Sequence, residues 1–268
     1  MATKDMICID KDARGVACVT IANAAKLNTL NRAVMTALIA AVEELAADSA
    51  LRVVVLRGAG TRAFIGGADI TEMAMLDADS ARDFITLVHQ SCDAFRRLPV
   101  PVIARIQGYA LGAGLEVAAA CDMRVATSDS QFGMPEVRIG IPSVVEAALL
   151  PQLIGWGRTR ELLLTGKMID APTAERWGLV EQVVTPAALD DAVEQQVAAI
   201  LECGRQAVRA QKALIQAWEN LPMREAIQLG INSFAASWDT DEPALMMGGF
   251  LDAMRRRKLA ASSGGNDA

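Results

Sequence analysis

The chain has 268 residues, a formal net charge of −6 and a hydrophobic content of 52%. This acidic balance provides no electrostatic footprint for nucleic acid. No stretch of about twenty residues is free of charged side chains, so the sequence predicts no membrane-spanning helix. The N-terminal segment lacks the basic start and apolar core of a secretion signal, which favours a cytoplasmic location. We expect the apolar excess to be buried between copies of the chain in a homo-oligomer.

Cysteine and histidine usage restricts the possible chemistry. The five cysteines are scattered without a C-x-x-C pair, which is typical of reduced thiols and predicts neither disulfides nor a metal site. The single histidine, His89, lies in a predicted helix, where a structural role is the simpler interpretation. A serine–histidine triad or a multi-histidine metal site would depend on His89, so carboxylates and backbone groups remain as the expected chemistry.

Strand and helix patterns alternate through the first two thirds of the chain. The first predicted helix covers residues 31–48, with Asn31 as its N-cap, and further helices cover 80–97 and 112–121. Residues 61–73 are expected to form a loop that enters a helix near residue 70, and residues 131–137 a strand or turn. The predicted strands cover residues 6–10, 15–21, 52–60, 101–108 and 122–127. This alternation predicts an α/β fold.

The pattern changes after residue 184, where helical periodicity continues without strands. We therefore expect two parts, a core of residues 1–189 and a helical region of residues 190–268, with a disordered tail over 261–268.

Two glycine-bearing turns follow predicted buried strands, GGAD at 66–69 and GYALGAG at 108–114. Small residues there allow backbone N–H groups to approach a ligand closely. The helix that begins near Gly112 presents unpaired amides and the positive end of its dipole, which would stabilise an oxyanion. Ala113 and Glu116 are three residues apart, so they lie on one helix face. A dinucleotide-binding loop is the competing interpretation, but Val117 replaces its third glycine.

Glu116 and Glu136 lie in segments that are otherwise mostly apolar or glycine. Burying a carboxylate raises its pKa toward neutrality, where a general acid or base works best. An ordinary ion pair or a capped loop would explain either glutamate alone. Together they are the main functional signal in the sequence.

Several segments in order resemble the crotonase superfamily, the enoyl-CoA hydratases and isomerases. They cover residues 25–31, 63–73, 101–122, 131–142 and 157–184. The resemblance implies a crotonase-type spiral of ββα turns, with a helical C-terminal region that builds a trimer, often stacked into a hexamer. The implied substrate is an acyl-CoA thioester, and coenzyme A is part of that substrate rather than a separate cofactor.

The resemblance also implies roles for individual residues. The thioester carbonyl would lie between the backbone N–H groups of Ala68 and Ala113. Glu116 would deprotonate the attacking water and Glu136 would protonate C2, without a metal or redox cofactor. The implied binding positions for coenzyme A and the substrate are Lys26, Leu27, Gly67, Asp69, Ile70, Thr71 and Gly112.

Two other functions stay open on the same scaffold. One is a double-bond isomerase, which needs no water, and the other is a non-catalytic homologue that binds RNA or a protein partner. The presence of both glutamates favours hydration over isomerisation, because isomerases and decarboxylases of the superfamily commonly lack one of them. The acidic balance and the intact pair of glutamates argue against the non-catalytic homologue.

Residues 141–151, IPSVVEAALLP, depart from the glycine-rich run of many hydratases. Val144, Val145 and Glu146 replace small residues near the expected acyl site, which favours a short or unusual acyl chain. The run resembles that of bacterial hydratases acting on methylthioacryloyl-CoA. Glu146 is either a third carboxylate in the site or a helix-start glutamate aligned with the dipole.

Overall fold

The computed structural model describes the backbone of residues 6–263 and the side chains of residues 6–258. The chain divides into two compact units, one ending at Ala198 and the other starting at Ala199. This division lies within helix α8 (Leu189–Leu201), whereas the boundary expected from the sequence lies at the start of that helix.

A six-stranded sheet forms the centre of the first unit, with the strand order β1-β2-β3-β5-β7-β10. Only β1 pairs antiparallel; the other neighbours are parallel. Its strands are β1 (Ile7–Lys11), β2 (Val16–Ile21), β3 (Val53–Gly58), β5 (Val102–Ile106), β7 (Met123–Thr127) and β10 (Gln182–Val184). The apolar runs predicted this sheet because parallel strands are covered on both faces, and the α/β prediction is confirmed.

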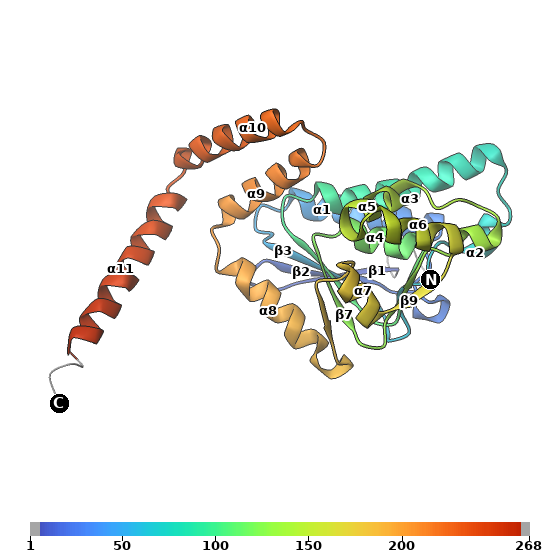
Figure 1. The fold of residues 1–268 in the computed structure, drawn as a ribbon, viewed down its shortest axis with the longest axis horizontal. Coiled ribbons are helices and arrows are strands. Elements are labelled where there is room, and N and C mark those ends of the chain that lie inside the picture. The colour runs from blue at the N-terminus through green and yellow to red at the C-terminus, as the bar shows by residue number, and fades with distance from the viewer. Residues whose placement is uncertain (1–5, 264–268) are drawn as a thin grey trace. The chain divides into compact units, whose positions relative to one another are not determined.

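Helices α1 (Arg32–Ala47) and α3 (Ala78–Arg97) pack against each other on one side of this sheet (Figure 1). The Asn31 side chain caps α1 by accepting a hydrogen bond from the Val34 N–H at 2.8 Å, as its position predicted. Both helices turn apolar faces to the core, including Leu38 on α1 and Phe84 on α3. The apolar face of α3 also lines a cavity of this unit.

A second sheet of four short strands has the order β4-β6-β8-β9. Its strands are β4 (Ala63–Ile65), β6 (Tyr109–Leu111), β8 (Gln131–Gly133) and β9 (Met168–Asp170). Residues 63–65 and 109–111 were expected in a loop and a turn, and that expectation is wrong. Strands of three residues are too short for a period-two pattern to show in the sequence.

Each of the first two short strands leads directly into a helix. β4 is followed by α2 (Ile70–Met73), and β6 is followed by α4 (Ala113–Ala120) with Gly112 as its N-cap. The remaining helical segments of this unit are η2 (Ala24–Lys26), η3 (Glu136–Ile139), η4 (Val145–Leu149), α5 (Leu150–Ile154), α6 (Trp156–Thr165), α7 (Ala171–Trp177) and η5 (Pro186–Ala188).

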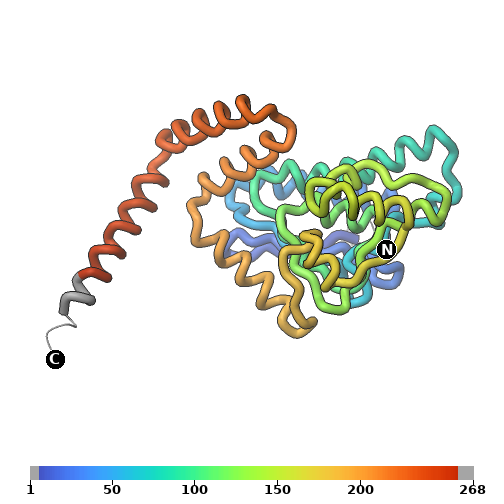
Figure 2. The backbone as a smooth tube through the Cα atoms, viewed as in Figure 1, coloured from blue at the N-terminus to red at the C-terminus, as the bar shows by residue number. Residues whose placement is uncertain are grey.

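Within the described residues, the regular elements of the second unit are all helices joined by short turns. It contains α9 (Arg205–Trp218), α10 (Met223–Ala236), η6 (Ser237–Asp239) and α11 (Glu242–Ser263). The part of this unit up to residue 258 is drawn in orange to red in Figure 2. Residues 261–263 of the expected disordered tail belong to α11, and residues 264–268 lie outside the described residues. No helix within residues 6–263 is long and apolar enough to cross a membrane.

Candidate active site

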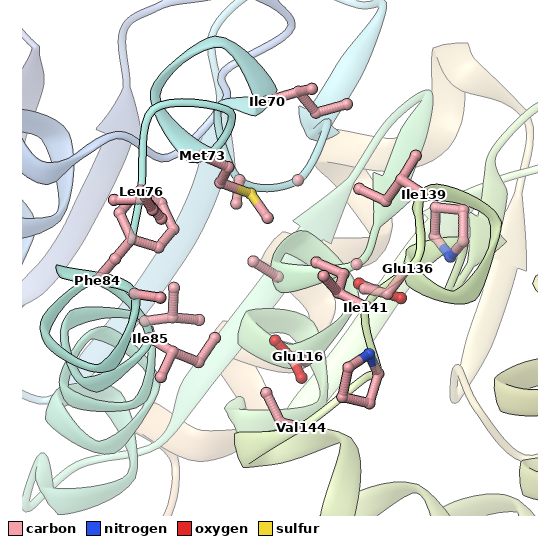
Figure 3. Close-up of a pocket in the computed structure, with 18 of the residues that line it drawn as sticks. Ile70, Met73, Leu76, Phe84, Ile85, Glu116, Glu136, Ile139, Ile141 and Val144 are labelled. Atoms are coloured by element: carbon pink, nitrogen blue, oxygen red, sulfur yellow. The ribbon is translucent and has the colours of Figure 1, made fainter. Parts of the chain in front are cut away.

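A cavity of about 790 Å³ opens in the first unit, next to the two strand–helix junctions. Its wall includes the residues after β4, the cavity-facing side of α3, the start of α4, and the segment from Pro135 to Val144. Figure 3 shows Glu116 and Glu136 pointing into this space from neighbouring elements, with apolar side chains around them. The cavity therefore combines a mostly apolar lining with the carboxylates of Glu116 and Glu136, and the charged residues Asp77, Arg82 and Arg138 also contribute to its wall.

Glu116 lies in the first turn of α4 and is 4% exposed. Its Oε1 accepts a hydrogen bond from the Ala147 N–H at 3.2 Å. Burial raises the pKa of Glu116 to about 8, and repulsion from Glu136 and Glu146 adds to the shift. The Ala147 amide acts in the opposite direction because it stabilises the ionised form. A carboxyl with this pKa can accept and release a proton near neutral pH.

Glu136 begins η3, directly after Pro135 at the end of the β8 segment, and is half-buried. The Ser143 hydroxyl donates a hydrogen bond to its Oε2 at 2.7 Å. Its Oε1 lies against Gly112, where an added Cβ would sit only 2.3 Å from that oxygen. The structure thus brings both predicted glutamates to one cavity, with Gly112 between their elements.

The backbone amides of Ala68 and Ala113 both belong to residues that line the cavity. Neither N–H has a hydrogen-bond acceptor among residues 6–263. Gly67 and Gly112, the residues before them, have φ values of +112° and +51°. A φ of +112° is readily adopted only by glycine, and at Gly112 the φ of +51° is combined with a ψ of −123°, which lies outside the left-handed helical region. Both turns therefore need glycine to orient the following amide.

The other predicted binding positions divide into two groups. Gly67, Ile70 and Gly112 line the cavity. The other four lie beside it without lining it: Lys26, Leu27, Asp69 and Thr71.

Two contacts link Lys26 and Leu27 to the GGAD turn. Lys26 Nζ lies 3.6 Å from Asp69 Oδ2, and the Leu27 carbonyl accepts a hydrogen bond from the Gly66 N–H at 2.8 Å. Asp69 in turn caps α2 by accepting from the Thr71 N–H at 2.9 Å.

Sequence reasoning missed most of the apolar wall. The side chains that complete it are Met73, Leu76, Phe84, Ile85, Val88, Ile139 and Ile141. The sequence predicted a helix over residues 80–97, but helical periodicity does not distinguish a core from a cavity. Ser143 was also missed, because nothing in the sequence relates this hydroxyl to Glu136.

Residues 141–151, the segment that departs from many hydratases, place only some of their side chains in the cavity wall. Val144 lines the cavity, as expected, whereas Val145 packs against the hydrophobic core. Glu146 is absent from the cavity wall; it lies in the first turn of η4, and its Oε1 is 2.7 Å from His89 Nδ1. Within the described residues, no group of three or more histidine, cysteine or acidic side chains could hold a metal ion.

Comparison with known proteins gives consistent relatives over most of the chain. Residues 11–254 match the enoyl-CoA hydratase/isomerase family. The chain is 35% identical to the crotonyl-CoA hydratase of Syntrophomonas wolfei, over 84% of this chain and 87% of that protein. It is 33% identical to the short-chain-enoyl-CoA hydratase of Clostridium acetobutylicum, over 94% of this chain and 96% of that protein.

Solved structures agree with these sequence matches. The crystal structure of an enoyl-CoA hydratase from Mycobacterium smegmatis superposes with a TM-score of 0.90 at 32% identity, covering 92% of this chain and 96% of that one. An enoyl-CoA hydratase from Bacillus anthracis gives a TM-score of 0.89 at 30% identity, over 92% of this chain and 96% of that one. The expected crotonase-type α/β fold is thereby confirmed.

Proposed function

Because the chain belongs to the enoyl-CoA hydratase/isomerase family, we propose that it is a hydro-lyase that adds water across the C2–C3 double bond of a 2-enoyl-CoA thioester. The observation that carries this proposal is the convergence of Glu116 and Glu136 on one apolar cavity. A hydration needs one group to activate water and one to protonate carbon, and these carboxylates supply both.

The thioester carbonyl would lie between the N–H groups of Ala68 and Ala113. Attack at C3 moves negative charge onto this oxygen as an enolate, and two fixed amides stabilise that charge without reorganising. Ala113 is the first residue of α4, so the positive end of the helix dipole adds to its effect. Loss of one such donor typically costs about 3–4 kcal/mol of transition-state stabilisation.

In the proposed reaction Glu116 takes a proton from water as the oxygen bonds to C3, and Glu136 gives a proton to C2. Repulsion between the two carboxylates favours a pair that carries a single proton, and burial raises the pKa of Glu116 to about 8. The proposed roles therefore require this proton to leave Glu116 before Glu116 can accept one from water. Main-chain amides and carboxylates suffice for every step, so we propose that no metal or redox cofactor takes part. Coenzyme A enters only as part of the substrate.

The segment around Lys26 and Leu27, with Asp69 and Thr71, is proposed to bind the coenzyme A portion beside the cavity. Ile70, which is exposed and lines the cavity, would contact the chain between coenzyme A and the thioester. Binding at these positions would place the acyl end among the apolar side chains deeper in the cavity.

The acyl group is proposed to be short. Val144 lies next to Glu116, and Ile85 and Phe84 line the cavity from α3 (Figure 3). These side chains would restrict the space for the acyl chain beyond C3. Two relatives carry the names crotonyl-CoA hydratase and short-chain-enoyl-CoA hydratase. The short sulfur-bearing substrate methylthioacryloyl-CoA fits the same restriction and is the specialised alternative.

Turnover on a panel of enoyl-CoA thioesters in isotopically labelled water tests the function. We expect crotonyl-CoA and methylthioacryloyl-CoA to be hydrated faster than long-chain substrates, with solvent oxygen in the 3-hydroxyl product. A shifted double bond without incorporated oxygen would instead identify an isomerase. A preference for long chains would contradict the restricted cavity.

The glutamate roles are tested by Glu116→Gln and Glu136→Gln, each of which keeps the shape of the side chain. We expect each to lower kcat by roughly two to four orders of magnitude while the circular dichroism spectrum is retained. A rate near that of the wild type in either purified variant would remove that residue from the mechanism.

We also propose that the chain forms a homo-oligomer, a trimer or a dimer of trimers, through its C-terminal helices. Support comes from large apolar side chains on α10 and α11 that are exposed in the single chain: Ile227, Ile231, Phe234, Leu245, Phe250 and Leu251. An exposed apolar surface of this kind marks an interaction site.

A further inference from the structure

Glu146 is a buried carboxylate that the proposed reaction does not use. It is 6% exposed, and its Oε1 lies 2.7 Å from His89 Nδ1. Its Oε2 is buried and has no hydrogen-bond partner within the described residues. A buried charge with an unsatisfied oxygen is costly, and apolar residues at such positions usually give equal or greater stability. Stability alone therefore does not explain the residue.

The backbone links Glu146 to the proposed general base. The next residue, Ala147, donates its N–H to Glu116 Oε1 at 3.2 Å and also to the Val144 carbonyl at 2.9 Å. The turn contains Val145 with a φ of +40°, a conformation that costs a β-branched residue about 1–3 kcal/mol. Strain of this kind persists only where surrounding contacts hold the backbone, and the bond from Glu146 to His89 on α3 is such a contact.

Several titratable groups surround Glu146 from the elements that pack on η4. Glu116 belongs to α4, His89 and Cys92 belong to α3, and α5 contributes no titratable side chain. Burial raises the pKa of the Cys92 thiol, and the charges of Glu146 and Glu116 add to the shift, so both carboxylates act on this region. Glu136 faces Glu116 from the other side. His89 is the member of this set that can carry positive charge.

We propose that Glu146 and His89 are positioning residues for Glu116, given the hydratase function above. His89 anchors Glu146 to α3, the anchored turn presents the Ala147 amide, and that amide holds the Glu116 carboxylate at the cavity. In addition, the negative charge of Glu146 makes ionisation of Glu116 less favourable. Neither residue touches the substrate in this arrangement, since neither lines the cavity.

The kinetic test separates the anchor from the charge. His89→Ala removes the anchor, and we expect kcat to fall by about 10- to 100-fold with KM changed little, as for a misplaced catalytic group. His89→Asn keeps a donor near the position of Nδ1 and should restore most of the lost rate. Glu43→Gln, which removes a carboxylate from the exposed face of α1, is the matched control and should behave as the wild type. An unchanged kcat in His89→Ala would overturn the anchoring role.

The effect of the Glu146 charge on Glu116 is tested without substrate, by carbon-13 NMR titration of glutamate side chains in the full chain. Glu116→Gln assigns the Glu116 signal, and Glu146→Gln removes the neighbouring charge while it keeps the side-chain shape. We expect the pKa of Glu116 to fall in Glu146→Gln and to stay unchanged in Glu43→Gln. In turnover, the rise of kcat/KM with pH should move to lower pH by the same amount.

The outcomes distinguish this proposal from the hydratase function on which it rests. Absence of hydration by the wild type on every thioester would overturn the function, and the NMR titration would still decide whether Glu146 acts on Glu116. Hydration by the wild type with an unmoved Glu116 titration in Glu146→Gln would overturn the electrostatic role alone. Loss of thermal stability in His89→Ala, with full rescue of stability but not of kcat by His89→Asn, would indicate a merely structural bond.

Discussion

Burial determines the protonation of Glu116, because α4 is buried along its whole length. The same property that prepares the carboxyl for proton transfer makes its ionised form a destabilising element of the fold. The Ala147 amide offsets part of this penalty, and the repulsion from Glu136 and Glu146 adds to it. Function and stability therefore oppose each other at this one side chain.

We therefore predict that the difference in stability between Glu116→Gln and the wild type depends on pH. The pKa of Glu116 is about 8 in the fold and about 4.5 as an ordinary glutamate. Between these values the native state binds more protons than the unfolded state, so the contribution of Glu116 to stability falls as pH rises through that window. Glu116→Gln stays neutral throughout. We expect it to match the wild type near pH 4 and to be more stable by a few kcal/mol near pH 9, measured by chemical denaturation.

The two proteins share every other carboxylate, so the difference between them reports the charge of Glu116 together with its repulsion with Glu136 and Glu146. Glu43→Gln, which changes an exposed side chain of α1, is the control and should follow the wild type at both pH values. Equal stability of Glu116→Gln and the wild type near pH 9 would contradict the raised pKa.

At the scale of elements, the site depends on two strand–helix junctions. β4 leads through Gly67 to Ala68, and β6 leads through Gly112 to Ala113, so each short strand presents one unpaired amide at the cavity. The strands pair in parallel, which brings the two junctions to the same edge of the small sheet. The geometry of the proposed oxyanion site is therefore a property of the backbone, and side-chain identity at positions 68 and 113 matters little.

Gly112→Ala tests this dependence on the backbone. The added Cβ would lie 2.3 Å from Glu136 Oε1, and the φ of +51° disfavours a side chain. Either the carboxylate or the following amide must move, so we expect kcat/KM to fall by about 100-fold and stability by about 1–2 kcal/mol. Gly157→Ala is the control, since a Cβ there meets nothing within 4 Å, and its rate should equal that of the wild type. A normal rate in Gly112→Ala would show that the junction tolerates displacement.

At the scale of the whole molecule, the sequence predicted two kinds of feature: elements with a pattern over several residues, and charged side chains in otherwise apolar segments. The central sheet was predictable because strands such as β3 and β5 consist mostly of apolar and β-branched residues. The short second sheet was not, because its pairing depends on contacts distant in sequence. Likewise Glu116 and Glu136 were found as carboxylates in apolar segments. The bond between Glu146 and His89, residues 57 positions apart, leaves no local pattern.

We expect α10 to form part of the interface of the proposed oligomer. Ile231 and Phe234 are 57% and 69% exposed and lie on one helix face, and the Phe234 ring centroid is 4.7 Å from that of Trp238. Burying such a side chain contributes about 1.5–3 kcal/mol, and a closed assembly repeats this gain in every subunit. Replacing both residues with aspartate should therefore convert the trimer or hexamer into smaller species, measured by light scattering after size-exclusion chromatography.

The control for added charge is Gln152→Asp, at an exposed polar position of α5. It should keep the mass of the wild type. A wild type that is monomeric at every concentration, or a double variant with an unchanged mass, would contradict an interface on this helix. The carboxylate pair, the two amides and the cavity wall all lie before residue 199, within the first unit. If a dissociated variant still hydrates its substrate, these groups of a single chain are sufficient for the reaction.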